Sequence, residues 1–205
     1  MVLVKFFQSG GPFMYAILVV MAIGLAIALE RFLYIVTTQS KTNRIWKILT
    51  PMLKANDYDR ADSTIQKSNT PLARVLAYGF SRRKSNAKRE LIESAMEEGV
   101  MEVMPELEQR THYLATLANI ATLLGLLGTI IGLIQAFTAV ASADPAEKAD
   151  LLSASISVAM NTTAFGLTAA IPLILIHSYL ATKTGRLVDN LEMAAVKCLN
   201  LMTDE

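Results

Sequence analysis

Hydrophobic residues in this chain gather in three long blocks, and the sequence between the blocks is mixed or polar. The blocks cover residues 12–36, 113–141 and 152–181. Because an α-helix rises about 1.5 Å per residue, a run of about twenty apolar residues crosses a hydrocarbon core about 30 Å thick. The pattern therefore predicts three transmembrane helices with these bounds, in an all-α integral membrane protein.

The sequence outside the blocks predicts further helices that extend beyond the membrane. Residues 43–55 are amphipathic, and Asp57 is placed to cap a following helix. A longer helix is expected from about Ser85 to Thr111, continuing straight into the second span. Its apolar positions are too sparse to form a core within one chain, so we expect it to pack against copies of itself. The alternative, a solvated helical hairpin in a monomer, would leave these apolar residues exposed to water. The remaining segments are predicted to be a short N-terminal stretch (1–11), a cytoplasmic helical region (37–112), a loop (142–151) and a C-terminal helix (182–205).

Positive charge sets the expected orientation of these helices. Residues 38–112 hold 13 of the 19 lysines and arginines. Since these residues concentrate on the cytoplasmic side of membrane proteins, we expect residues 37–112 and the C-terminus to be cytoplasmic. The N-terminus and the 142–151 loop are then on the opposite side of the membrane. The net charge is +1 and the basic residues are interleaved with acidic ones, so the charge gives no indication of nucleic-acid binding and we expect no such partner. Contact with lipid is expected from the three apolar blocks.

The second block carries small and hydroxyl side chains along one helix face. Gly128 and Gly132 form a small-xxx-small pair, which lets another helix approach closely. A helix that faces lipid has no need of such a face, whereas a helix packed on another helix or lining a pore does. Periodicity alone leaves both interpretations open and favours packing. The residues that share the face are Thr122, Gly125, Thr129, Gly132 and Ala136.

A second polar but uncharged segment changes that balance. The third block contains Asn161, Thr162, Thr163 and Gly166, together with several serines. Hydroxyl and carboxamide groups without partners are costly in hydrocarbon, so they are expected to face the protein interior or water. Two such helices indicate a shared polar seam. We expect Thr122, Thr129, Asn161, Thr162 and Thr163 to lie along this seam, with helix packing through Gly125, Gly128, Gly132 and Gly166.

Nothing in the sequence suggests an enzyme. The two histidines, His112 and His177, lie at predicted membrane boundaries and are expected to be interfacial anchors. The single cysteine, Cys198, cannot form an intrachain disulfide. Metal-ligand spacing of Cys and His, a glycine-rich phosphate loop and a nucleophile–base pair are all missing from the sequence. We therefore predict no catalytic residues and no cofactor.

Several motifs carry a resemblance to a known family. The runs LLGLLGTIIG (123–132) and NTTAFGLTAAIP (161–172) resemble the MotA/TolQ/ExbB ion-channel family. Glu30-Arg31, NDYDRA (56–61) and PLARVLAYG (71–79) support the resemblance, which covers almost the whole chain. The chain is most similar to the three-helix ExbB/TolQ branch.

This resemblance implies a fold, a location and a function that spacing alone does not show. The location is the bacterial inner membrane, with the N-terminus and the 142–151 loop in the periplasm. The ion path is expected to be lined by Thr122, Thr129, Asn161, Thr162 and Thr163. Such proteins form a ring, typically of five copies, whose second and third helices line a central pore. Two single-span partners of the ExbD/TolR type occupy the pore, each with a membrane-buried aspartate. Ion flow through that aspartate drives work that is passed to periplasmic machinery such as TonB or TolA. The pore threonines of the family match Thr129 and Thr163.

The chain departs from the family pattern at one position in the third helix. Many ExbB and TolQ proteins carry a glutamate five positions before the pore threonine, and here that position is Val158. Oxygen ligands near Thr129, Thr162 and Thr163 would suit sodium, whereas a proton can pass through water to the partner's aspartate. We favour sodium slightly and keep the proton open as the transported ion. The alternative function is a helical membrane scaffold for a single-span partner, without ion flux.

Overall fold

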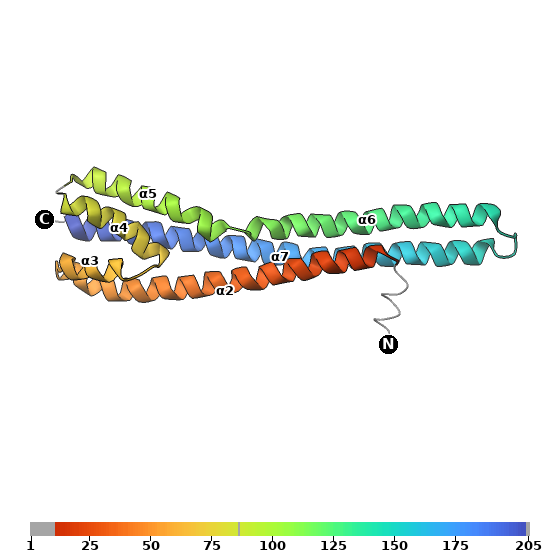
Figure 1. Cartoon of the computed structure of the whole chain (residues 1–205), viewed down its shortest axis with the longest axis horizontal. Coiled ribbons are helices and arrows are strands. Elements are labelled where there is room, and N and C mark those ends of the chain that lie inside the picture. The colour runs from red at the N-terminus through yellow and green to blue at the C-terminus, as the bar shows by residue number, and fades with distance from the viewer. Residues whose placement is uncertain (1–10, 86, 204–205) are drawn as a thin grey trace. The chain divides into compact units, whose positions relative to one another are not determined.

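The structure, a computed structural model, describes residues 11–85 and 87–203, and these residues form α-helices and no strand. Three helical segments are long and apolar enough to cross a membrane: Phe13–Lys54, Arg89–Ser142 and Lys148–Met202. The predicted all-α class with three spanning helices is confirmed. Apart from Gly11, the predicted N-terminal stretch lies outside the described residues. The helices, coloured along the chain in Figure 1, are α2 (Phe13–Lys54), α3 (Tyr58–Gln66), α4 (Pro71–Lys84), α5 (Arg89–Glu108), α6 (Thr111–Ser142) and α7 (Lys148–Thr203).

The chain divides into two compact units. One, called here the membrane unit, consists of Met1–Glu30 and Arg110–Tyr179. The other, called the bundle unit, consists of Arg31–Gln109 and Leu180–Glu205. Helices α2 and α7 contribute residues to both units, while α6 belongs to the membrane unit and α3, α4 and α5 belong to the bundle unit.

The membrane unit buries small residues and exposes large apolar ones. Helix α6 turns a stripe of alanines and glycines inward, including Ala118, Ala121 and Gly125. Large side chains point outward instead; Leu123 and Phe137 are 62% and 65% exposed. This inverted distribution is expected where hydrocarbon replaces water around a helix, since lipid accepts large apolar side chains and close helix contact needs small ones.

The bundle unit has a conventional hydrophobic core. Its short helices begin with side-chain caps: Asp57 accepts a hydrogen bond from the amide of Arg60, and Thr70 accepts one from the amide of Ala73. The cap at Asp57 is the one that the sequence predicts. Five helices supply the core, which includes Leu49 and Leu53 of α2, Ile65 of α3, Leu76 and Phe80 of α4, Met96 and Val103 of α5, and Leu191 and Leu199 of α7.

The prediction that α5 buries its apolar face against other copies of the chain is largely wrong. Ile92, Met96, Val100 and Val103 are buried within the chain, because α4 and α7 contribute to the same core. The apolar residue Met101 stays 69% exposed. The core that the sequence pattern could not supply to α5 alone is therefore provided by segments distant in the chain.

The predicted continuous helix through Thr111 is also wrong, because α5 ends at Glu108 and α6 begins at Thr111. Between them, Arg110 adopts a left-handed backbone with φ of 63°. The buried guanidinium of Arg31 donates to the carbonyl of Leu107 at 2.5 Å and to that of Glu106 at 3.4 Å. A cation at carbonyls left free by a helix C-terminus is favourable, so Arg31 stabilises the end of α5 there.

Polar contacts continue from this point along α5. The hydroxyl of Tyr34 donates to Oε1 of Glu106 at 2.8 Å. Arg74 of α4 forms ion pairs with Glu106 at 2.7 Å and with Glu102 at 2.5 Å. The hydrogen bond to Glu102 is the main cause that raises the pKa of Arg74 above its usual range. Tyr78 also donates to Glu102, so the network ties α2, α4 and α5 together.

Candidate functional site

A close helix contact in the membrane unit runs along the glycines of α6 and α7. A Cβ atom on Gly125 would lie 3.3 Å from the Cα atoms of both Gly166 and Thr163. A Cβ atom on Gly166 would lie 2.7 Å from the carbonyl oxygen of Ala121. Any side chain at these positions would meet backbone, so the glycines allow the two helices to touch.

Two further glycines of α6 repeat this arrangement toward its C-terminal end. A Cβ atom on Gly128 would overlap the methyl group of Thr162, and one on Gly132 would lie 2.8 Å from the Cβ of Ala159. Thus the structure places all the glycines of the predicted packing set, Gly125, Gly128, Gly132 and Gly166, between α6 and α7.

Two threonines meet at the edge of this glycine contact. The Oγ1 atoms of Thr129 and Thr163 are hydrogen-bonded to each other across the helices. Both hydroxyls also reach the carbonyl oxygen of Gly125, at 3.1 Å from Thr129 and 2.8 Å from Thr163. Both residues are half-buried, so the three oxygens form a small polar cluster at the edge of the α6–α7 glycine contact. This contact is called the seam below, and the edge that carries the two threonines is called its margin.

The other predicted path residues do not join this cluster. Thr162 is 1% exposed, and its hydroxyl donates to the carbonyl of Val158 at 3.0 Å while its methyl faces Gly128. Thr122 is exposed and donates to the carbonyl of Ala118 at 3.1 Å. The structure therefore separates the three threonines proposed as sodium ligands. The hydroxyls of Thr129 and Thr163 meet, whereas Thr162 lies in the packing contact.

Asn161 lies on a different face of α7. It lines a groove of about 590 Å³ together with Ser153 and Ser157, each one helical turn from the next. From sequence alone we group Asn161 with Thr163, although the two residues lie on different faces of the helix. A spacing of four residues is the signal that distinguishes this serine–asparagine row from Thr163.

The seam offers hydroxyl and carbonyl oxygens in place of titratable groups. Among the described residues, no group of three or more His, Cys, Asp or Glu side chains is arranged to hold a metal ion. A threonine hydroxyl both donates and accepts hydrogen bonds, and a carbonyl accepts them. Such oxygens can replace part of the hydration shell of a monovalent cation or order a chain of water.

The fold and the seam define a helical membrane protein in which two tightly packed spans carry a polar margin. The model of the MotA/TolQ/ExbB proton channel family matches residues 67–193, and the chain belongs to this family. The predicted family resemblance is thus confirmed. It makes the chain a membrane protein of ion-driven energy transduction, in a family of channels and not of enzymes.

Individual relatives agree with the family match. An ExbB homolog from Methanothermobacter thermautotrophicus is 30% identical over 203 residues, which is 98% of this chain and 68% of the relative. An ExbB-like protein from Synechocystis sp. is 24% identical over 82% of this chain and 80% of the relative. The Tol-Pal system protein TolQ from Haemophilus influenzae is 35% identical over 38% of this chain and 34% of its own length.

Proposed function

We propose that this chain is the pore-forming subunit of an ion-driven motor in the inner membrane. Together with a single-span partner of the ExbD/TolR type, it converts ion motive force into mechanical work on periplasmic and outer-membrane machinery. The observation that carries the proposal is the hydroxyl pair of Thr129 and Thr163 at the edge of the α6–α7 contact. These are the residues that match the pore threonines of the family, and the pair comes from two different spans.

The proposed assembly is a ring of copies, most simply a pentamer, with two partner spans in its centre. The N-terminus and the 142–151 loop face the periplasm, and the bundle unit lies in the cytoplasm, as the distribution of lysine and arginine suggests. The margin with Thr129 and Thr163 faces the central axis. Native mass spectrometry of the detergent-extracted chain tests the ring, and a monodisperse monomer at micromolar concentration would contradict it.

The role of the hydroxyl pair is tested by replacing either threonine with valine. Valine keeps the shape of the side chain and removes the hydroxyl, so the ring should still assemble. Partner-dependent ion flux in proteoliposomes should be lost in Thr129→Val and Thr163→Val. The matched control is Thr138→Val, because Thr138 is an exposed residue of α6 whose hydroxyl donates only within its own helix, to Ile134. Flux equal to wild type in both pore variants would contradict the role of the hydroxyl pair. A wild-type complex without partner-dependent flux would favour the scaffold function instead.

For the transported ion we favour sodium over the proton. Position 158 carries valine, so this chain contributes no carboxylate there, and hydroxyl and carbonyl oxygens are what the seam offers. Coupling then depends on the partner's aspartate together with these oxygens. Flux and work that vanish in potassium and return with millimolar sodium would support sodium. Activity that is unchanged in sodium-free buffer and abolished by a protonophore would establish the proton.

A further inference from the structure

The bundle unit has a groove between α5 and α7 that its own core leaves open. The groove has a volume of about 450 Å³, within the range of clefts that bind ligands or side chains. The exposed side chains of Met101 and Val196 and the half-buried side chain of Met104 contribute its apolar surface, and Val100, Ala195 and Leu199 form its floor. Methionine adapts its shape to different partners, so a surface that contains it suits an inserted apolar side chain.

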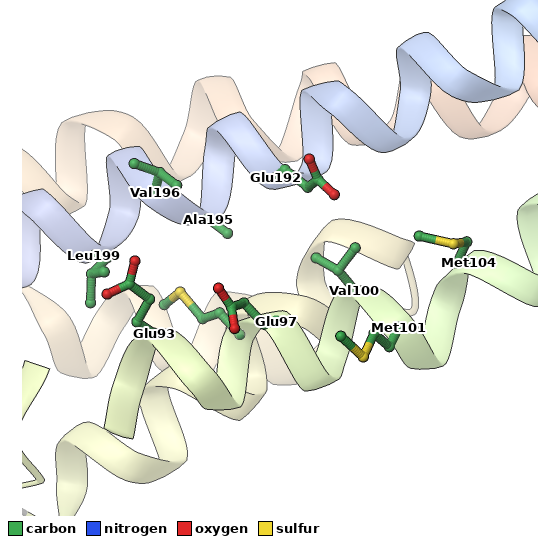
Figure 2. A pocket seen from close by; sticks show the side chains of 10 residues that line it. Glu93, Glu97, Val100, Met101, Met104, Glu192, Ala195, Val196 and Leu199 are labelled. Atoms are coloured by element: carbon green, nitrogen blue, oxygen red, sulfur yellow. The ribbon is translucent and has the colours of Figure 1, made fainter. Parts of the chain in front are cut away.

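Three glutamates border the apolar surface of the groove. Glu93 and Glu97 lie one turn apart on α5, and Figure 2 shows them directed toward α7, which carries Glu192. All three are exposed, and none of them takes part in the ion pairs found among the described residues. A binding partner that matches this groove therefore has an exposed apolar side chain flanked by lysine or arginine residues.

The same unit carries a surface of that chemistry on α2. Ile48 is 42% exposed, whereas its neighbours Ile45 and Leu49 are buried in the core. Arg44 lies one turn before it and Lys41 two turns before it, so both border Ile48 on the same face. These basic residues are also exposed and absent from the ion pairs of the described chain.

We propose that the α5–α7 groove of one copy receives the Lys41–Ile48 surface of α2 from a neighbouring copy. The inference rests on the proposed function, because it assumes the ring. The two surfaces belong to different helices, so the contact is head-to-tail, and head-to-tail contacts generate rings or open filaments. Copies in one bilayer share a common orientation, which restricts the repeat to rotation about the membrane normal and therefore favours closure into a ring.

Cross-linking between differently tagged chains tests this contact directly. One chain carries Ile48→Cys and the other carries Val196→Cys, a groove residue that is 51% exposed. The two are co-expressed at full length, and mild oxidation should give a dimer with both tags, since a disulfide forms only where Cα atoms come within about 7 Å. The matched control replaces Ile48→Cys with Arg60→Cys, at another exposed position of the bundle unit, and should give no such dimer.

A charge exchange provides a second, independent measurement. Glu97→Lys alone and Arg44→Glu alone should each raise the protein concentration at which half of the chains are assembled, by about fivefold. The double variant restores the pairing with reversed signs and should return this midpoint toward wild type. Far-UV circular dichroism confirms that the single variants remain folded, as expected for exposed positions.

The outcomes separate this inference from the proposed function. A native ring without the Ile48–Val196 cross-link would overturn the inference and leave the motor proposal standing. A second outcome would also overturn the inference: in the ring, Val196→Cys reacts with thiol reagents and becomes protected only when the single-span partner is added. The groove would then bind the partner and not a neighbouring copy. A chain that remains monomeric would overturn both proposals.

Discussion

Replacing Gly166 with alanine tests whether backbone contact between α6 and α7 holds the candidate site together. The added Cβ would lie 2.7 Å from the carbonyl oxygen of Ala121 and 3.0 Å from the Cα of Gly125. Ordinary contacts begin at 3.4 Å, so α6 must move by about 0.7 Å, the difference between 3.4 and 2.7 Å. Both atoms belong to the backbone, and no side-chain rotation can relieve the overlap.

The cost of this movement can be estimated from two opposing terms. Overpacking of a close contact costs about 1–3 kcal/mol. Replacing glycine with alanine inside a helix stabilises the helix by about 1 kcal/mol. We therefore expect Gly166→Ala to lower the free energy of unfolding by up to about 2 kcal/mol. It should also weaken the hydrogen bond between Thr129 and Thr163, which depends on the same helix spacing.

Gly185→Ala is the matched control for this experiment. Gly185 lies on the same helix, and a Cβ atom there would meet nothing within 4 Å. The control should therefore keep the helix gain and increase stability by about 0.5–1 kcal/mol. Unfolding in detergent, followed by circular dichroism at 222 nm, compares the two variants. If Gly166→Ala proves as stable as Gly185→Ala, the two helices do not touch through their backbones and the seam described above is wrong.

Three further predictions concern single side chains. Arg31→Met should destabilise the bundle unit by about 1.5–3 kcal/mol and speed amide exchange near the end of α5, with Arg31→Lys intermediate; equal exchange in all three proteins would refute the anchoring role. Burial raises the pKa of the Cys198 thiol to about 12, so hydrophilic thiol reagents at pH 7–8 should label it only after unfolding, and rapid labelling of the native chain would contradict its burial. Thr162→Ser should lower stability more than Thr162→Val, because the methyl against Gly128 fills the contact and the hydroxyl bonds its own helix; the reverse order would show that the hydroxyl matters more.

Helix periodicity predicts more of this fold than of the candidate site. The three spans and the cap at Asp57 follow from local features, namely apolar length and a side chain that bonds a nearby amide. The end of α5 does not, because it depends on Arg31, which lies 76 residues away from Leu107 in sequence. Burial of the α5 face likewise depends on α4 and α7, which a local pattern does not reveal.

In the candidate site, too, some residues are predicted correctly from the sequence and others depend on contacts with a distant helix. The sequence predicts that Thr129 and Thr163 lie together, and the structure joins their hydroxyls. It groups Thr162 with them because Thr162 is adjacent in sequence, yet neighbouring residues on a helix point about 100° apart. That rotation turns Thr162 toward Gly128. Which of two adjacent threonines packs and which faces the margin is decided by the partner helix.

Arg31 binds main-chain oxygens of Glu106 and Leu107, and this has a consequence for how related sequences can diverge. A carbonyl is present whatever side chain a residue carries, so substitutions at positions 106 and 107 leave the acceptors of Arg31 in place. The contact between Arg31 and the end of α5 therefore leaves no covarying pair between position 31 and positions 106 or 107. The side-chain bond of Tyr34 to Glu106 differs in this respect, because it is lost when position 106 changes.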